Sequence, residues 1–518
     1  MSARGVVAAG HPLTAEAGAR VLREGGNAVD AAVAAVLTSF VTESPLTGLG
    51  AGGYMLVDGG DEPVLLDFFV AVPGANVAAA RSELVPVPVY FTEEVPQIFH
   101  VGAASCGVPG TPAGLETAVE RFGTMPLGDL AAPAAALARE GVTVNPEQAF
   151  FLAILAPILT LYEEARAIYA PEGRILAAGD RFRFPDLGDA LERLGTEGSG
   201  PFYRGDVASA ISDWVIDRGG TLGRSDLERY EPIPREPVRA RFRDHEVLTN
   251  PPPSSGGLLI AFALDVLERL GRAGVEEVVG AMEAAQAART EDFLAGLREP
   301  QFASRFLDRA AVAAHADGVA RRERAGEGPL EADDHLGSTT HITAVDGERR
   351  CASVTCSNGT GSGLLVPGTG VHVNNMLGEQ DLNPHGFHRH PPGVRMPSMM
   401  SPTLVRSSGE LEIGLGSGGS NRIRSAVLQT VLRLVVDRMP VADAVVAPRV
   451  HVESGIVHAE PGVDESALGR LSDRGYEVVR WRERNVFFGG VHTVARDART
   501  GELEGGGDPR RGGAVAVA

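Results

Sequence analysis

The spacing of apolar positions predicts a chain that begins with helices. Residues 12–26 (PLTAEAGARVLREGG) and 27–43 (NAVDAAVAAVLTSFVTE) have helical spacing and form a predicted hairpin, with caps at Thr14 and Asn27. The following stretch, GLGAGGYMLVDGGDEPVLLDF, predicts two strands around a turn. Helical patterns then dominate to about residue 325, interrupted by a Pro/Ser/Gly-rich loop at 249–257.

The pattern changes near residue 338. Residues 325–338 (AGEGPLEADDHLGS) are polar and acidic and predict a mobile loop. Beyond them TTHITAV, CASVTCS, GVHVNN, ELEIGLG and GVHTVARD have the composition of short strands, and only 421–438 and 464–475 have helical patterns. The sequence therefore predicts a helix-rich part, residues 1–338, followed by a strand-rich part, residues 339–518.

Charge and composition exclude several classes of function. The formal net charge of −20 argues against a nucleic-acid or anionic-membrane partner, because both repel a polyanion. All 47 cationic side chains are arginine, so the chain has no lysine for a Schiff base, for pyridoxal phosphate or for a phosphate-binding P-loop. Three cysteines are too few for a disulfide scaffold. No signal peptide is visible, and the apolar run at 149–162 is too short to span a bilayer, which predicts a cytoplasmic location.

The paired threonines at the start of the strand-rich part are candidate nucleophiles. A threonine inside a chain needs a neighbouring base before its hydroxyl can attack a carbonyl. Cleavage of the Ser338–Thr339 bond would give Thr339 a free α-amine with a pKa near ~8, so that one residue would supply nucleophile and base. Two threonines are also common at the start of an ordinary strand, and spacing alone leaves both interpretations open.

Two other clusters carry less chemistry. The glycines before Tyr54 are followed by a strand, not by the helix of a nucleotide-binding loop, which favours close backbone packing. His385, His388 and His390 could ligate zinc, but no acidic or cysteine ligand with a recognised spacing accompanies them. Solvated loop histidines are the favoured interpretation, and we predict no metal site.

Nine blocks along the chain resemble the gamma-glutamyltranspeptidase family, in that family's order. They are GVVAAGHPLTAEAGARVLREGGNAVDAAVAA, GVPGTPAGLETAVERFGTMPL, PPPSSGG, GSTTH, NNMLGEQDLNP, MSPTLV, GSGGSNRI, APRVH and GGGDPRRGG. The resemblance implies an α/β fold, the Ntn-hydrolase four-layer αββα sandwich, without a cofactor. It further implies a precursor that cleaves itself between Ser338 and Thr339 into a large subunit (1–338) and a small subunit (339–518). Thr339 would then form an acyl-enzyme with a small-molecule amide or peptide of the γ-glutamyl type and pass the acyl group to water or an amine.

The resemblance also implies roles for individual residues. The block GSGGSNRI matches the family's glycine-rich oxyanion loop, so the backbone N–H groups of Gly419 and Ser420 are the candidate donors. The strand VTCSNG matches the segment that carries a helper threonine and a substrate-binding asparagine, with a deletion of about two residues in the alignment. Ser357 and Asn358 are the implied counterparts.

The substrate pocket departs from the family pattern. Phe69 stands where the family has an arginine whose guanidinium binds the substrate α-carboxylate. Met376 and Met399 replace a glutamine and a serine, and Glu379 replaces the aspartate that receives the substrate α-amine. Asn375 and Ser398 keep family positions at this pocket. Another arginine, such as Arg395, could compensate for the lost one.

These departures leave three hypotheses for the function. The chain could cleave γ-glutamyl amides, or it could have an altered substrate, as an apolar-acyl amidase or acylase or as a hydrolase of a carbon–carbon bond. It could also be an unprocessed binding homologue without catalytic activity. The first two share the nucleophile and the oxyanion loop, so the catalytic blocks do not separate them.

Overall fold

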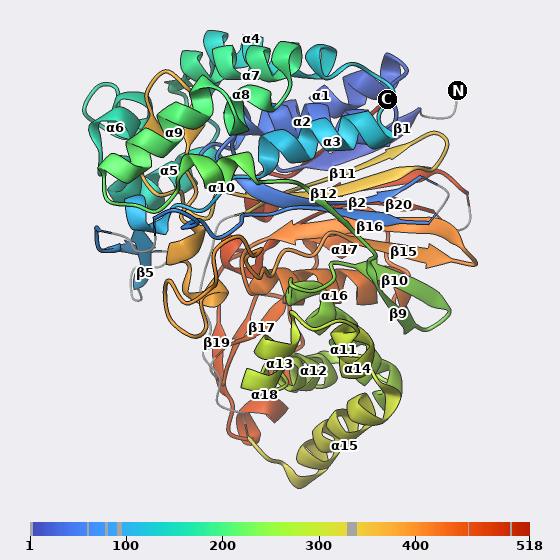
Figure 1. Cartoon of the computed structure of the whole chain (residues 1–518). Coiled ribbons are helices and arrows are strands. Elements are labelled where there is room, and N and C mark those ends of the chain that lie inside the picture. Colours follow the sequence, from blue (N-terminus) through green and yellow to red (C-terminus); the bar gives the residue numbers. More distant parts are fainter. Residues whose placement is uncertain are drawn as a thin grey trace.

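The framework of the chain is a pair of antiparallel β-sheets stacked face to face (Figure 1). The computed structural model describes residues 4–59, 62–77, 81–90, 96–328, 339–453, 455–497 and 500–518. The first sheet has the order β22 (Ala514–Val517), β1 (Gly5–Ala9), β11 (Thr340–Asp346), β12 (Cys351–Ser357), β2 (Gly52–Asp58), β3 (Val64–Phe68) and β8 (Ile233–Arg235). The second has the order β21 (Leu503–Gly507), β20 (Gly490–Arg496), β16 (Glu410–Gly418), β15 (Thr403–Ser407), β10 (His245–Thr249) and β9 (Val238–Phe242).

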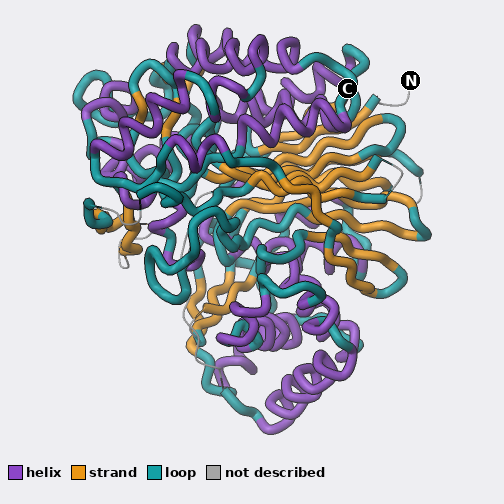
Figure 2. The backbone as a smooth tube through the Cα atoms, viewed as in Figure 1, coloured by secondary structure: helices purple, strands orange, loops and turns teal. Residues whose placement is uncertain are grey.

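Helices cover the outer faces of both sheets. Figure 2 shows the two layers of strands between helical layers. The first sheet is covered by α1 (Pro12–Arg23), α2 (Ala28–Thr42) and α3 (Thr111–Phe122), with α4 (Leu127–Glu140) and α7 (Pro185–Glu197) packed outside them. The second is covered by α11 (Gly256–Leu270), α16 (Arg422–Val435) and α17 (Val441–Val446). This arrangement is the αββα sandwich that the family resemblance implies.

Smaller elements lie around this framework. Helices α5 (Pro146–Leu159), α6 (Glu163–Tyr169), α8 (Gly200–Tyr203), α9 (Asp206–Asp217) and α10 (Arg224–Glu228) extend the upper layer in Figure 1. Helices α12 (Val275–Ala287), α13 (Glu291–Gly296), α14 (Phe302–Phe306), α15 (Arg309–Ala325) and α18 (Glu465–Asp473) form the lower end. The short strands are β4 (Val85–Tyr90), β5 (Pro96–Val101), β6 (Val142–Thr143), β7 (Arg181–Phe182), β13 (Leu365–Val366), β14 (Val371–His372), β17 (Val450–Glu453), β18 (Ile456–Ala459) and β19 (Glu477–Arg480).

Alternating side chains divide the interior into two hydrophobic cores. On β2, Met55 and Val57 join the core under α1 and α2, whereas Tyr54 and Leu56 join the core that includes the second sheet. Cys351 and Cys356 on β12 likewise face opposite sides, as their spacing predicts. The inner face of the first sheet therefore carries every second residue of its strands toward the second sheet.

The two parts that the sequence distinguishes are interleaved in both sheets. Residues before 329 supply β1, β2, β3 and β8 to the first sheet and β9 and β10 to the second, and residues from 339 onward supply the other strands. The predicted acidic loop falls mostly on residues 329–338, which lie outside the described residues, as does Ser338.

Three local expectations have definite outcomes. The predicted cap at Thr14 is wrong: α1 begins at Pro12, and the Nδ1 of His11 accepts a hydrogen bond from the backbone N–H of Leu13 at 3.1 Å. The cap at Asn27 is confirmed as a capping box with Asp30. The apolar run at 149–162 is mostly α5, and across the described ranges no helix has the length and hydrophobicity needed to traverse a bilayer.

Candidate active site

Thr339 lies immediately before β11, opposite the end of β12. The pairing of Thr340 with Cys356 continues so that Thr339 faces Ser357. The hydroxyl of Thr339 donates to the hydroxyl of Ser357 at 3.5 Å, and Ser357 accepts the backbone N–H of Gly359 at 3.0 Å. Thr339 is 5% exposed, so the two hydroxyl groups meet in a buried position at the ends of these two central strands.

The glycine-rich loop connects β16 to α16 beside Thr339. Gly419 has a φ of 126° and Ser420 a φ of 52°, so two successive residues lie in the left-handed region. A serine there is strained by about 1 kcal/mol or more, and its hydroxyl donates to Asp381 Oδ2 at 2.7 Å. A Cβ on Gly418 would lie 2.2 Å from the carbonyl oxygen of Thr339, so the loop packs directly on the backbone of the candidate nucleophile.

A pocket opens beside Thr339, and we call it the acyl pocket. Its apolar lining consists of Phe69, Met376, Leu382, Met399, Met400 and Ile423. Its polar lining includes Ser357, Glu379, Asp381, Ser398 and Ser420. Among the described residues that line this pocket, none is cationic.

Two residues with implied substrate contacts lie behind the pocket wall. The side-chain amide of Asn358 donates to the carbonyl of His372 at 3.2 Å. The amide of Asn375 donates to Glu379 Oε1 at 3.1 Å, and its oxygen accepts the N–H of Thr360 at 2.9 Å. Both asparagines are buried, and neither lines the acyl pocket. Asn375 positions Glu379; a direct contact of Asn358 or Asn375 with substrate stays a prediction.

Comparison with known families shows to which family the chain belongs. The family model described as gamma-glutamyltranspeptidase matches residues 14–518. The chain belongs to the gamma-glutamyltranspeptidase family.

Named relatives within the gamma-glutamyltranspeptidase family include hydrolases and acylases. The chain is 30% identical to the glutathione hydrolase proenzyme of Bacillus subtilis strain 168, over 99% of this chain and 91% of the relative. It is 32% identical to the acylase ACY 1 proenzyme of Pseudomonas sp. strain V22, over 92% and 88%. The crystal structure of cephalosporin acylase from Bacillus halodurans superposes with a TM-score of 0.85 at 25% identity, over 99% and 96% of the two chains. The chain is therefore an amide hydrolase or transferase of the gamma-glutamyltranspeptidase family.

The acyl pocket contains a carboxyl group with a raised pKa, that of Glu379. Burial, followed by the charge of Asp381, raises the pKa of Glu379 to about 8, and the hydrogen bond from Asn375 opposes the shift only in part. At neutral pH this shift favours the protonated form of Glu379. Sequence reasoning missed Asp381, although it stands two residues after Glu379 in the NNMLGEQDLNP block.

Arg395 does not replace the arginine that the gamma-glutamyltranspeptidase family has at position 69. Its Nε lies 3.4 Å from Oδ1 of buried Asp67, its guanidinium lies 4.2 Å from the ring centroid of Tyr230, and it donates to the carbonyl of Glu231. Phe69 itself stacks on Tyr54 with ring centroids 5.3 Å apart. Position 69 thus holds an aromatic ring, and the side chain of Arg395 is engaged with Asp67, Tyr230 and Glu231.

The histidine loop gives no support to a metal site. The guanidinium of Arg298 donates to Nδ1 of His390 at 2.8 Å, and Nε2 of His390 lies 2.7 Å from the carbonyl oxygen of Leu382. His385 lies 3.3 Å from Glu291. Within the part of the chain that the structure describes, no group of three or more His, Cys, Asp or Glu side chains could hold a metal ion.

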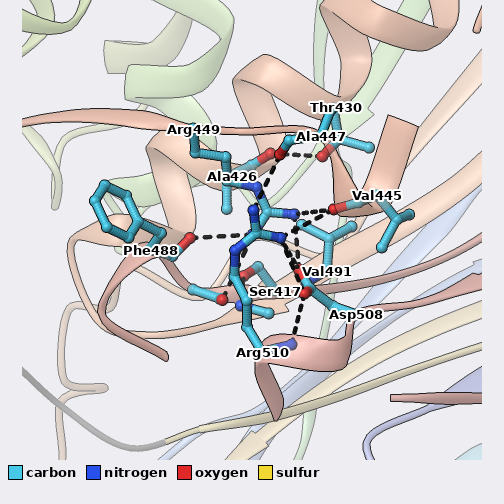
Figure 3. Close-up of polar contacts among 12 residues, drawn as sticks. Ser417, Ala426, Thr430, Val445, Ala447, Arg449, Phe488, Val491, Asp508 and Arg510 are labelled. Carbon is cyan, nitrogen blue, oxygen red and sulfur yellow. Dashed lines mark hydrogen bonds and ion pairs between the residues drawn. The ribbon is translucent and has the colours of Figure 1, made fainter. Parts of the chain in front are cut away.

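A buried ion-pair cluster fixes the C-terminal GGGDPRRGG segment. Figure 3 shows Arg449 and Arg510 converging on Asp508; their nearest distances to its carboxylate are 2.7 and 3.1 Å. Both guanidinium groups also donate to the carbonyl of Val445, at 3.0 and 3.1 Å. Burial opposes ionisation of Asp508, but the two cations outweigh it and lower its pKa to about 2. The cluster therefore anchors the segment just before Arg511, whose guanidinium contacts the backbone of Thr339.

Proposed function

We propose that the chain is a self-processing N-terminal-threonine hydrolase or acyltransferase. Cleavage between Ser338 and Thr339 would separate residues 1–338 from 339–518 and free the α-amine of Thr339. The observation that carries the proposal is the position of Thr339, which joins the acyl pocket, the hydroxyl of Ser357 and the glycine-rich loop in one place. Relatives named as proenzymes support the processing step.

The proposed reaction uses groups that surround Thr339. Its hydroxyl oxygen attacks the amide carbon while the α-amine takes the proton, and backbone N–H groups of Gly419 and Ser420 stabilise the oxyanion. The carbon–nitrogen bond of the substrate then breaks, and the proton passes to the leaving amine. Water or another amine attacks the resulting ester and releases the acyl group. Ser357 would hold the attacking hydroxyl in orientation.

We further propose that the acyl group is apolar and lacks an α-carboxylate. Six apolar side chains line the acyl pocket, including Phe69 and two methionines at positions that the family fills with polar residues. A carboxylate placed beside Phe69, Glu379 and Asp381 would lose its hydration without gaining a cation. The pocket therefore favours the acylase hypothesis over γ-glutamyl cleavage. No feature of the described site favours a carbon–carbon bond hydrolase.

Substrate comparison tests this proposal. We expect kcat/KM for a γ-glutamyl anilide to be at least about 30-fold below that for a phenylacetyl or hexanoyl anilide, because a bidentate charge pair missing from the site is worth about 2 kcal/mol or more. The common aniline leaving group gives both assays the same optical readout and removes differences in leaving-group chemistry. Equal turnover of the γ-glutamyl anilide would contradict the proposed specificity. A protein that binds the anilides but turns over neither would support the non-catalytic hypothesis.

A further inference from the structure

A second pocket shares Thr339 with the acyl pocket but is otherwise lined by different residues. Thr340, Gly418 and Arg511 bound it next to the nucleophile, and Glu43, which directly follows α2, also lines it. We call it the rear pocket. It places one cation and one buried carboxyl group at the backbone of Thr339, outside the region where the acyl group binds.

Arg511 contacts the backbone of Thr339 directly. Its Nη1 donates to the carbonyl oxygen of Thr339 at 3.0 Å, and its guanidinium lies 5.2 Å from the ring centroid of Phe151. Burial, together with the charge of Arg422, lowers the pKa of Arg511 to about 10, so the side chain remains cationic at neutral pH. Asp508, three residues before Arg511, ties this segment to the interior through its ion pairs with Arg449 and Arg510.

Glu43 is a buried carboxyl group whose charge, when it is ionised, is opposite in sign to that of Arg511. Its carboxylate accepts hydrogen bonds from Thr14, at 3.0 Å, and from Thr340, the residue next to the nucleophile. Burial raises the pKa of Glu43 to about 7, although both hydrogen bonds and the charge of Arg511 oppose the shift. Around pH 7 the rear pocket therefore carries the full charge of Arg511 and only part of the charge of Glu43.

The histidines of the rear pocket add little charge. Burial lowers the pKa of His11 and His492 to about 4 and that of His341 well below its usual value, so all three are neutral near pH 7. Glu147 on α5 is the other carboxyl group that lines this pocket. Across Thr339, the acyl pocket presents Glu379 and Asp381.

We propose that Arg511 is a positioning residue that fixes the backbone of Thr339 and keeps the α-amine freed by cleavage in its neutral, proton-accepting form. This inference rests on the proposed function, because only a cleaved chain has that amine. The nitrogen and the carbonyl oxygen of one residue lie about 3–4 Å apart, so Nη1 of Arg511, 3.0 Å from that oxygen, lies no more than about 7 Å from the amine. At an effective dielectric constant of about 20–40, a like charge at this distance lowers an amine pKa by about 1–2 units.

The absence of lysine permits a direct measurement of this amine. Cyanic acid adds to a neutral amine to give a urea, with no leaving group, and does not add to an ammonium ion. In the cleaved protein the only amines are the two α-amines, that of Thr339 and that of the first residue of the large subunit. Mass spectrometry of each subunit after brief cyanate treatment across a pH series gives the pH of half-maximal modification for Thr339, and the other α-amine serves as an internal reference.

We expect the half-maximal pH of Thr339 in the wild type to lie about one unit or more below the reference. Arg511→Gln should bring it to within about 0.3 units of the reference. Arg511→Lys keeps the charge but adds an amine to the small subunit, so for this variant the modification is read on the N-terminal peptide of that subunit after proteolysis, where most of the wild-type offset should remain. A wild-type value equal to the reference, or an unchanged offset in Arg511→Gln, overturns the inference. If Arg511→Gln remains uncleaved, the wild-type offset alone decides. A wild type without a free Thr339 amine refutes the proposed function, and the mass spectrum distinguishes that result from the others.

Discussion

Replacing Thr339 with alanine should abolish turnover and leave the protein as one chain of 518 residues. The substitution removes the hydroxyl that meets Ser357 and forms one boundary of the acyl pocket. Among the described residues of the site, Thr339 is the hydroxyl-bearing residue that would become a chain terminus and whose backbone also packs against the glycine-rich loop. We expect the loss in kcat/KM to be on the order of 10³-fold or more, because the attacking group itself is removed.

Thr339→Ser is the matched control for this prediction. It keeps the hydroxyl and, after cleavage, the α-amine, and it loses only one methyl group in a buried position. We expect cleavage and measurable turnover in Thr339→Ser, and neither in Thr339→Ala, when both are followed by initial rates and by denaturing gels. Turnover by an intact Thr339→Ala chain at wild-type rates would eliminate Thr339 as the nucleophile.

Replacing Phe69 with arginine should shift selectivity toward γ-glutamyl substrates. The new guanidinium would enter the acyl pocket, which Glu379 and Asp381 also line, and would supply the cation that the pocket lacks. A charge-assisted contact of about 2 kcal/mol corresponds to a gain of about 30-fold in kcat/KM for the γ-glutamyl anilide relative to the apolar anilide.

Phe69→Leu provides the comparison, because it removes the stacking on Tyr54 without adding charge. It should change the rates for both anilides in parallel and leave their ratio within about threefold. The measurement is the ratio of kcat/KM values, with thermal unfolding as a check that each variant is folded. A ratio that stays unchanged in Phe69→Arg would mean that residue 69 does not contact the acyl group.

The sequence predicts those parts of the site that depend on local pattern or on recurrent blocks. Alternation predicts that Cys351 and Cys356 face opposite cores, and the blocks around Phe69, Met376 and Met399 lead to residues that line one pocket. Strand β1 escapes prediction because GVVAA is short and buried on both faces, so it has no alternation to reveal it. The cap at Thr14 was misassigned because Pro12 begins the helix earlier.

Contacts between distant segments could not be predicted from local pattern. Arg511 meets Thr339 across 172 residues of sequence, and Glu43 meets Thr340 across 297. Both contacts depend on how strands pair and how the C-terminal segment packs, which periodicity within one element does not report. For Asn358 and Asn375 the recurrent blocks predict positions near the pocket. They do not predict the direction of the side chains, which depends on hydrogen bonds to His372 and Glu379.

The most direct test of the account is the intact mass of the purified wild-type protein. We expect two chains, the smaller of which begins at Thr339 and ends at Ala518, and we expect a mechanism-based acylating reagent to add its mass to that smaller chain alone. A fully active protein that consists of one chain, with residues 338 and 339 still joined, would contradict the account, because the proposed base would not exist.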